Sequence, residues 1–183
     1  MRIYSPTKQK ILLLLLAGVA LGLSRSPKNY FKILESIPKE WREIERKRLL
    51  SIVREFYNDR LVDYKENRDG EVEIILTKEG KKKAIKYQLD EMQIKKQEKW
   101  DGKWRMVVFD IPEKKKKARE ALRNKLKDIG FKELQKSVFI HPYECEDEID
   151  FILEVFEIRP YVRFVRVDMF TNDEQFKLKF GLY

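Results

Sequence analysis

Three side chains in the second half of the chain belong to types that carry out chemistry: Asp110, His141 and Cys145. Asp110 ends an apolar stretch, and an aspartate at a strand end can hold Mg²⁺ and activate water when a second carboxylate lies nearby. Within the turn only Glu113 offers one. A magnesium site would therefore need Asp110 from a second subunit. The same position, two residues before Pro112, also suits a turn former or helix cap, which is the interpretation we prefer.

The sequence contains a single histidine and a single cysteine, too few for sites that need several of either residue. One cysteine cannot form an internal disulfide or a zinc cluster, and one histidine rules out histidine-rich metal centres. A lone histidine in a strand is most often packed, so His141 is expected to be structural. Cys145 lies between Glu144 and Glu146, which disfavour a thiolate. Asp110 is therefore the one candidate for catalysis or metal binding, and no cofactor is expected to be required.

The charge pattern favours a polyanionic partner. The 183 residues are 39% charged and carry a formal net charge of +9. Such an excess favours nucleic acid first and an anionic membrane surface second. Because acidic residues are interspersed among the basic ones, solvated helix faces explain much of this charge.

The apolar segment Ile11–Leu23 resembles the core of a signal peptide, with Arg2, Lys8 and Lys10 before it. It is shorter than the roughly 20 residues that a membrane-spanning helix needs. We interpret it as a buried first helix that begins near Ser5-Pro6-Thr7 and runs to Leu23. The protein is then expected to be cytoplasmic, with no membrane partner.

Two more helices are predicted, from Pro27 to Ile37 and from Lys39 to about Asp59, which makes a helix-turn-helix candidate. One face of the third helix is apolar, with Trp41, Ile44, Leu49, Ile52, Val53 and Phe56. The other side carries residues that could reach phosphates and guanine edges in a major groove. These candidate DNA contacts are Arg42, Arg46, Lys47, Ser51 and Arg54. An amphipathic helix with surface ion pairs is the alternative.

A β-hairpin follows this helix. Its predicted strands are Leu61–Lys65 and Glu71–Leu76, joined by an Asp-Gly turn at 67–70. Lys65 and Arg68 are placed to reach phosphate or minor groove. The hairpin is followed by Leu76-Thr77-Lys78-Glu79-Gly80, and in this order the segment resembles winged-helix transcription regulators. Residues 1–90 are therefore predicted to form a winged helix-turn-helix DNA-binding domain, although winged helices also serve as protein-protein modules.

Residues 91–103 are predicted as a helical and polar linker, and residues 104–183 as a second domain. Its expected elements are a strand at 104–111, a helix at 113–129, an extended pair at 131–142, a helix at 145–157 and a strand at 161–170. The order βαββαβ predicts a ferredoxin-like domain. The alternating segment Phe176–Tyr183 is expected to be an edge strand, or to pair across a dimer. The fold class is α+β, a winged helix-turn-helix followed by a ferredoxin-like domain.

Three segments of the second domain carry a specific resemblance. Residues 103–113 (KWRMVVFDIPE), 121–131 (ALRNKLKDIGF) and 134–142 (LQKSVFIHP) resemble PaaX-type transcriptional repressors. That family combines a winged helix with a domain like the ferredoxin-fold nuclease subunit of CRISPR adaptation complexes. In those nuclease subunits the aspartate matching Asp110 has an assigned magnesium-dependent phosphodiesterase role. The full-length repressors carry a further C-terminal region, and the family is associated with sensing an acyl-CoA. This sequence ends at Tyr183 without that region, so an acyl-CoA effector is not the expected partner here.

The sequence thus predicts a repressor-like transcription regulator that binds duplex DNA as a homodimer through Arg42, Arg46, Lys47, Ser51, Arg54, Lys65 and Arg68. The second domain is expected to pair the subunits. The alternative is a magnesium-dependent endonuclease, or a DNA-binding subunit related to CRISPR adaptation, that uses Asp110. A third possibility is a pair of protein-interaction modules.

Overall fold

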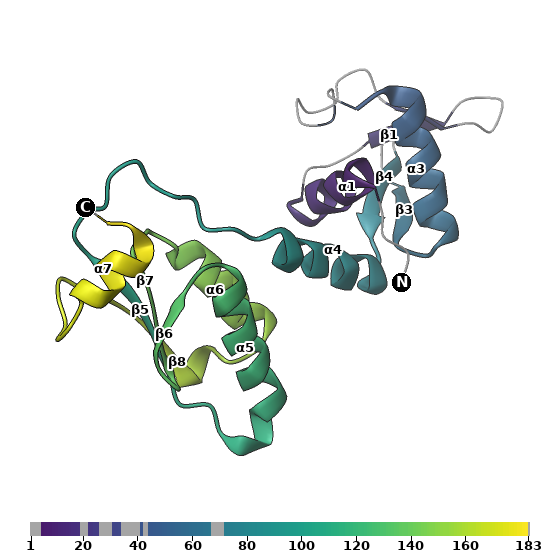
Figure 1. Ribbon diagram of the computed structural model, residues 1–183. Coiled ribbons are helices and arrows are strands. Elements are labelled where there is room, and N and C mark those ends of the chain that lie inside the picture. Colours follow the sequence, from purple (N-terminus) through teal and green to yellow (C-terminus); the bar gives the residue numbers. More distant parts are fainter. Residues whose placement is uncertain are drawn as a thin grey trace. The chain divides into compact units, whose positions relative to one another are not determined.

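A computed structural model describes residues 5–18, 22–25, 31–33, 41, 44–66 and 72–182. The chain divides into two compact units, Met1–Glu91 and Met92–Tyr183. Both units combine helices with an antiparallel sheet, so the α+β class is confirmed. Figure 1 shows the elements of each unit, and each unit is described by itself below.

The first unit contains helices around a four-stranded sheet. Its elements in chain order are α1 (Pro6–Leu16), β1 (Gly22–Arg25), β2 (Phe31–Ile33), α3 (Arg46–Asn58), β3 (Val62–Glu66), β4 (Val72–Leu76) and α4 (Lys78–Glu91). The strand order is β2-β1-β4-β3, and all three pairings are antiparallel. The predicted hairpin is present as β3 and β4, with Val62 opposite Leu76 and Glu66 opposite Val72. Its predicted turn, 67–70, lies outside the described residues.

The predicted helix boundaries near the N-terminus are wrong. The first helix ends at Leu16 rather than Leu23, because Gly18 takes a positive φ of 75° and the chain then enters β1. The segment predicted as a helix from Pro27 to Ile37 contains β2, which pairs with β1. The third helix begins at Arg46, not Lys39. Among the described residues no helix is long and apolar enough to cross a membrane.

The first unit is held together by the apolar face of α3. Leu49, Ile52, Val53 and Phe56 are buried in one cluster with Ile11 and Leu12 of α1 and with residues of β3, β4 and α4. Trp41 and Ile44, which precede α3, are buried in the same cluster. All six apolar residues predicted to share this face are therefore buried, and the opposite side of the helix is left open.

Thr77 and Gly80 connect the hairpin to α4. The Thr77 Oγ1 atom accepts a hydrogen bond from the backbone N–H of Gly80 at 3.0 Å and so caps the helix. A Cβ atom on Gly80 would overlap the backbone carbonyl of Leu61. Only glycine lets the first turn of α4 approach the start of β3 this closely. The Thr-Lys-Glu-Gly segment therefore has a structural reason, which is to dock α4 on the hairpin.

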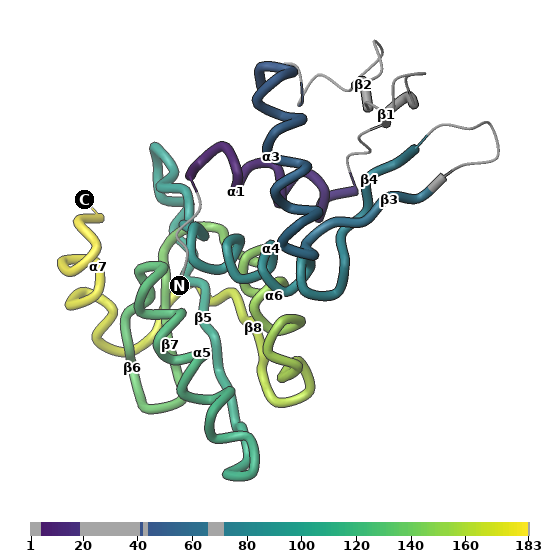
Figure 2. Tube along the Cα trace, turned by 90° about the vertical axis from the view of Figure 1, so that its right-hand side faces the viewer, coloured from purple at the N-terminus to yellow at the C-terminus, as the bar shows by residue number. Residues whose placement is uncertain are grey.

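The second unit is a ferredoxin-like sandwich. Its elements are β5 (Trp104–Phe109), η1 (Glu113–Lys115), α5 (Lys116–Asp128), β6 (Lys132–Gln135), β7 (Val138–His141), α6 (Glu146–Val155), η2 (Arg159–Tyr161), β8 (Val162–Val167) and α7 (Glu174–Phe180). The strand order β6-β7-β5-β8 is antiparallel throughout. Helices α5 and α6 cover one face of this sheet, and α7 lies on the other side (Figures 1 and 2). The predicted βαββαβ order is confirmed.

The predicted strand at 176–183 is wrong, because this segment forms α7. The alternating residues Phe176, Leu178 and Phe180 also include an i, i+4 pair, and Phe176 and Phe180 pack with Trp104 and Leu182. Gly181 ends the helix in the left-handed conformation with φ 65°. Leu178 is left 66% exposed. The period of two and the helical i, i+4 spacing coincide in so short a segment, and packing against Trp104 decides between them.

Part of the segment predicted as a linker packs on the second unit. Ile94 and Trp100 contact the cluster around Trp104, with the Trp100 and Trp104 ring centroids 5.0 Å apart. The Trp100 indole N–H donates to the carbonyl of Lys103 at 2.9 Å. The chain is therefore fixed to the second unit several residues before β5 begins.

Candidate nucleic-acid interface

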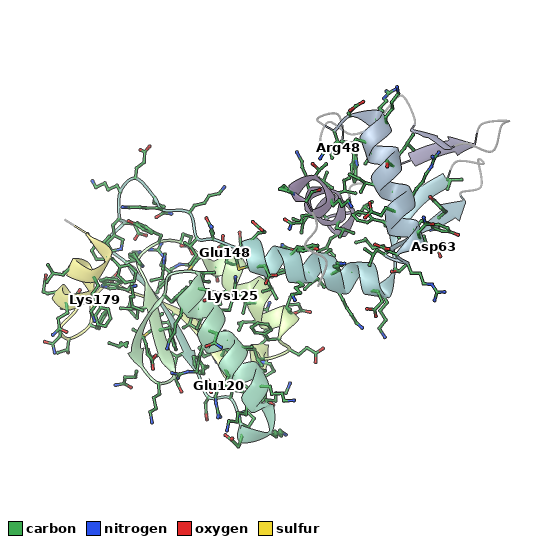
Figure 3. The ribbon with its side chains drawn as sticks, turned by 45° about the vertical axis from the view of Figure 1, so that its right-hand side comes forward. Arg48, Asp63, Glu120, Lys125, Glu148 and Lys179 are labelled. Atoms are coloured by element: carbon green, nitrogen blue, oxygen red, sulfur yellow. The ribbon has the colours of Figure 1, made fainter. Side chains whose placement is uncertain are left out.

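Helix α3 begins with three exposed cations, Arg46, Lys47 and Arg48, and has no acidic residue in its first turn. Cations at this end are unfavourable for the helix itself, because the positive end of the helix dipole lies there. None of the three forms an ion pair within the described residues. Figure 3 labels Arg48 at this end of α3. The first turn is therefore a concentrated positive charge that forms no ion pair with the carboxylates the structure describes.

The open side of α3 carries a single stripe. Lys47, Ser51, Arg54 and Asn58 follow one another at i, i+4, i+7 and i+11, and all four are exposed. Together with Leu50 and Glu55 they line a hollow on the molecular surface. Three of the residues predicted to contact DNA, Lys47, Ser51 and Arg54, are thus brought together.

The two flanks of this stripe meet different elements. On one side Lys8 of α1 forms an ion pair with Glu55. On the other side the ring of Tyr57 packs on Tyr64 of β3, with centroids 4.6 Å apart. Helix α3 therefore contacts α1 on one flank and the hairpin on the other. The exposed stripe lies between these two contacts and faces away from the buried core.

The remaining predicted contacts lie elsewhere. Arg46 is exposed in the first turn but does not line the hollow. Lys65 is exposed on β3 and lines a different hollow, together with Leu15, Glu73 and Lys81. Arg42 and Arg68 lie outside the described residues. The structure thus brings together three of the seven predicted contacts.

Sequence reasoning missed Arg48, Asn58 and Tyr57. Arg48 adds a third cation to the first turn, and Asn58 extends the stripe by one turn. Asn58 could have been found by continuing the i, i+4 spacing from Arg54. Tyr57 could not, because only the fold places β3 and Tyr64 beside it.

Asp110 follows β5 directly, and its side chain is exposed. Its backbone N–H donates to the carbonyl of Tyr161 at 2.9 Å. Neither η1 nor α5 has a side-chain cap hydrogen bond, so the helix-cap role that we preferred for Asp110 is not found. Glu113 is engaged with Arg119, at 2.8 Å. Within the described residues no three His, Cys, Asp or Glu side chains are grouped to hold a metal. One chain alone does not fit a magnesium site.

His141 and Cys145 are buried, as a structural role requires. Burial lowers the pKa of His141 to about 4, and its Nδ1 atom accepts a hydrogen bond from the backbone N–H of Tyr143 at 3.2 Å. Burial raises the pKa of the Cys145 thiol to about 12, and Glu144 adds to this. His141 is therefore neutral and Cys145 a protonated thiol near neutral pH. Neither is poised for catalysis.

A buried arginine organises the N-terminal edge of the second unit. Arg105 on β5 is 3% exposed, and its guanidinium donates to both carboxylate oxygens of Asp101, at 2.6 and 2.8 Å. It also donates to Glu144 and to the carbonyl of Pro142, both at 2.9 Å. The hydrogen bond from Arg105 lowers the pKa of Asp101 to about 2. Burial would raise the pKa of Glu144, but hydrogen bonds from Arg105 and Arg166 outweigh it and lower this pKa to about 2.

The strand order, the paired helices and the exposed Asp110 at the end of the first strand define the second unit as a ferredoxin-like domain. Residues 97–178 match the family model described as the PaaX protein central Cas2-like domain. The resemblance to PaaX-type proteins is therefore confirmed over this segment, which covers most of the second unit. No curated protein matches the chain.

Proposed function

We propose that the chain is a repressor-like transcription regulator that binds duplex DNA as a homodimer in the cytoplasm. The observation that carries the proposal is the cluster of Lys47, Ser51 and Arg54 on the open side of α3, next to a hairpin. The match of the second unit to a PaaX domain is consistent with such a regulator.

The topology of the first unit supports a winged helix. In the order α1, β1, β2, α3 and hairpin β3–β4, a hairpin directly follows an exposed helix, as a wing follows a recognition helix. Strand β1 pairs with β4 and so adds a third strand to the hairpin. In this arrangement α3 is the recognition helix and the β3–β4 hairpin is the wing.

Electrostatics supports DNA as the ligand of α3. Arg46, Lys47 and Arg48 lie where backbone N–H groups and the helix dipole are also positive. Their mutual repulsion is relieved when a phosphate backbone comes close and counterions are released. We assign Lys47, Ser51 and Arg54 to the major groove, with Arg42 and Arg46 beside them. Lys65 and Arg68 are assigned to phosphate or minor groove beside the hairpin.

A dimer would complete this function. A ferredoxin-like second unit that pairs two chains would place two α3 helices at a fixed separation. That separation would set the half-site spacing on a palindromic operator.

Charge reversal on α3 tests the proposal. In Arg46→Glu/Lys47→Glu two phosphate contacts are lost and two repulsions are gained, so duplex binding should weaken by at least about 100-fold at moderate salt. The slope of log K against log salt should fall by about 1.8. Lys116→Glu/Lys117→Glu makes the same change in charge on exposed residues of α5 and is the matched control. Equal affinities for the wild type and the α3 variant would reject the assignment.

A second function, metal-dependent DNA cleavage, is favoured by one observation. Asp110 is exposed at the strand end of a Cas2-like domain, in the position expected of a nuclease subunit. The described residues of one chain group no complete metal site, so the partner subunit's carboxylate would have to join it. Divalent-dependent cleavage that disappears in Asp110→Asn would support this function. Intact DNA binding without cleavage under magnesium or manganese would remove it.

A further inference from the structure

Two tyrosines join the recognition helix to the hairpin. The rings of Tyr57 on α3 and Tyr64 on β3 lie with centroids 4.6 Å apart and an interplanar angle of 32°. Tyr64 is half-buried, and its backbone N–H donates to the Asp63 carboxylate at 2.8 Å. Burial raises the pKa of Tyr64, and the neighbouring Tyr57 adds to this, so its hydroxyl stays neutral. Tyr64 therefore provides a fixed, uncharged support for the ring above it.

Tyr57 is the exposed member of the pair, with 46% of its surface accessible. Within the part of the chain that the structure describes, its hydroxyl makes no hydrogen bond. The stacking on Tyr64 restricts the ring, so little rotational freedom remains to be lost when the hydroxyl binds a partner. An exposed aromatic ring carrying a free donor is thus held in place at the junction of α3 and β3.

The position of Tyr57 points to the edge of a groove rather than its floor. On a helix with 3.6 residues per turn, Tyr57 lies about 60° around the axis from Arg54, on the side of the hairpin. When a helix lies in a major groove, residues at the centre of its outer face reach the bases, and residues on its flanks meet the sugar-phosphate backbone. A DNA strand that runs over the junction of α3 and β3 would therefore cross Tyr57.

We propose that the Tyr57 hydroxyl, held in place by Tyr64, donates a hydrogen bond to a backbone phosphate of duplex DNA at the junction of α3 and the hairpin. This inference rests on the proposed DNA-binding function and adds a specific contact to it. The contact is neutral on the protein side, so it releases no counterion and contributes equally at low and high salt. It positions the helix in the groove and carries no sequence information.

The test is Tyr57→Phe, measured with a duplex enriched from a random pool by the wild-type protein and with an unrelated duplex. Affinity for both duplexes should fall by roughly threefold to tenfold, as the loss of one hydrogen bond predicts. The salt slope should stay at the wild-type value, whereas Lys47→Met should lower it by about 0.9. Tyr161→Phe, in the second unit, is the matched control and should change neither quantity.

A second variant tests the support. Tyr64→Leu keeps the hydroxyl of Tyr57 but removes the ring beneath it. It should weaken binding to both duplexes by a factor similar to that of Tyr57→Phe. Thermal unfolding of each variant checks that the first unit stays folded at the assay temperature. Unchanged affinity in Tyr57→Phe would overturn the inference, as would a loss confined to the enriched duplex, which would mean a base contact.

These failures are distinguishable from failure of the proposed function. If the wild type binds DNA and Arg46→Glu/Lys47→Glu does not, but Tyr57→Phe binds normally, the tyrosine contact is wrong and the function stands. If the wild type binds neither duplex at any salt concentration, both are wrong.

Discussion

The two units contain the same number of basic residues but treat them differently. Residues 1–91 contain 20 Lys and Arg against 14 Asp and Glu, and residues 92–183 contain 20 against 17. In the second unit Arg105, Arg119, Arg123, Arg159 and Arg166 are each ion-paired within the unit. In the first unit Arg46, Lys47 and Arg48 have no ion pair among the described residues. Pairing, rather than the number of cations, distinguishes these two groups of side chains.

This difference separates stability from binding. A buried, paired arginine such as Arg105 contributes to the fold, and its removal leaves carboxylates behind. An exposed, unpaired cation at a helix N-terminus costs stability and is compensated only by an anion from outside. Replacing these two kinds of cation should therefore have opposite signatures. Replacing the buried Arg105 should change unfolding, and replacing the exposed cations of α3 should change binding.

Arg105→Met should have the largest effect on stability. It removes the hydrogen bonds that join Asp101, Pro142 and Glu144, and should cost about 2–4 kcal/mol of unfolding free energy. The cost stays below that of a fully buried pair because both carboxylates reach solvent. Denaturant unfolding measures it. The control is Arg166→Met. Arg166 pairs with the same Glu144 at the surface, so its replacement should have a much smaller effect. Equal costs would mean that burial of Arg105 does not matter.

His141 should make the stability of the second unit depend on pH. Burial, together with nearby Arg105 and Lys132, lowers the pKa of His141 from 6.5 to about 4 in the folded state. Between these values the unfolded chain binds a proton that the folded chain does not, so stability falls as pH falls from about 6.5 to about 4. The full loss should be about 3 kcal/mol.

The variant His141→Asn identifies the source of this pH dependence. Asparagine keeps an acceptor near the Tyr143 N–H and does not titrate. The unfolding free energy, measured at several pH values between 4 and 6.5, should therefore depend more steeply on pH for the wild type than for the variant. Parallel curves would assign the dependence to other groups.

Gly80→Ala should destabilise the first unit by about 1–3 kcal/mol, because the added methyl group overlaps the Leu61 carbonyl and must displace α4 from the hairpin. Lys81→Ala, on the exposed side of the same helix, is the matched control. If the two units unfold separately, only the transition of the first should move. Calorimetry of the full chain measures this. An unchanged transition would mean that α4 can shift without cost.

The sequence predicted the second unit well because its elements are long and periodic. Each of β5, α5 and α6 begins within three residues of its predicted start, since buried apolar positions fix the period. The error at 176–183 arose where a period of two also contains an i, i+4 pair. Near the N-terminus a continuous apolar run carries no period, so its division between α1 and β1 could not be predicted.

In the candidate site, too, some residues could be predicted from local spacing and others could not. The exposed stripe on α3 follows from helical spacing alone, and Lys47, Ser51 and Arg54 were predicted from it. Tyr57 and the Arg105 network depend on partners distant in sequence, namely Tyr64 on β3 and Glu144 before α6. No local pattern indicates such pairs. For Asp110 the sequence indicated the strand end, but only the fold showed that Glu113 is held by Arg119.

The variant with the smallest expected effect tests whether ion pairing keeps the second unit from binding DNA. Glu113 on η1 and Glu133 on β6 hold Arg119, Arg123 and Lys127 of α5 at 2.8 to 3.0 Å. These pairs are at the surface, so Glu113→Gln/Glu133→Gln should barely change unfolding. Of the ion pairs that the structure describes, the variant leaves Arg119 and Arg123 only their longer contacts with Glu120, at 3.8 and 3.9 Å. Weak, sequence-independent duplex affinity should therefore rise by a few fold at low salt and vanish at high salt. The rise should persist when Arg46→Glu/Lys47→Glu is added, because it comes from the second unit. If affinity does not rise, pairing does not keep the second unit off DNA, and the contrast with α3 must come from shape instead.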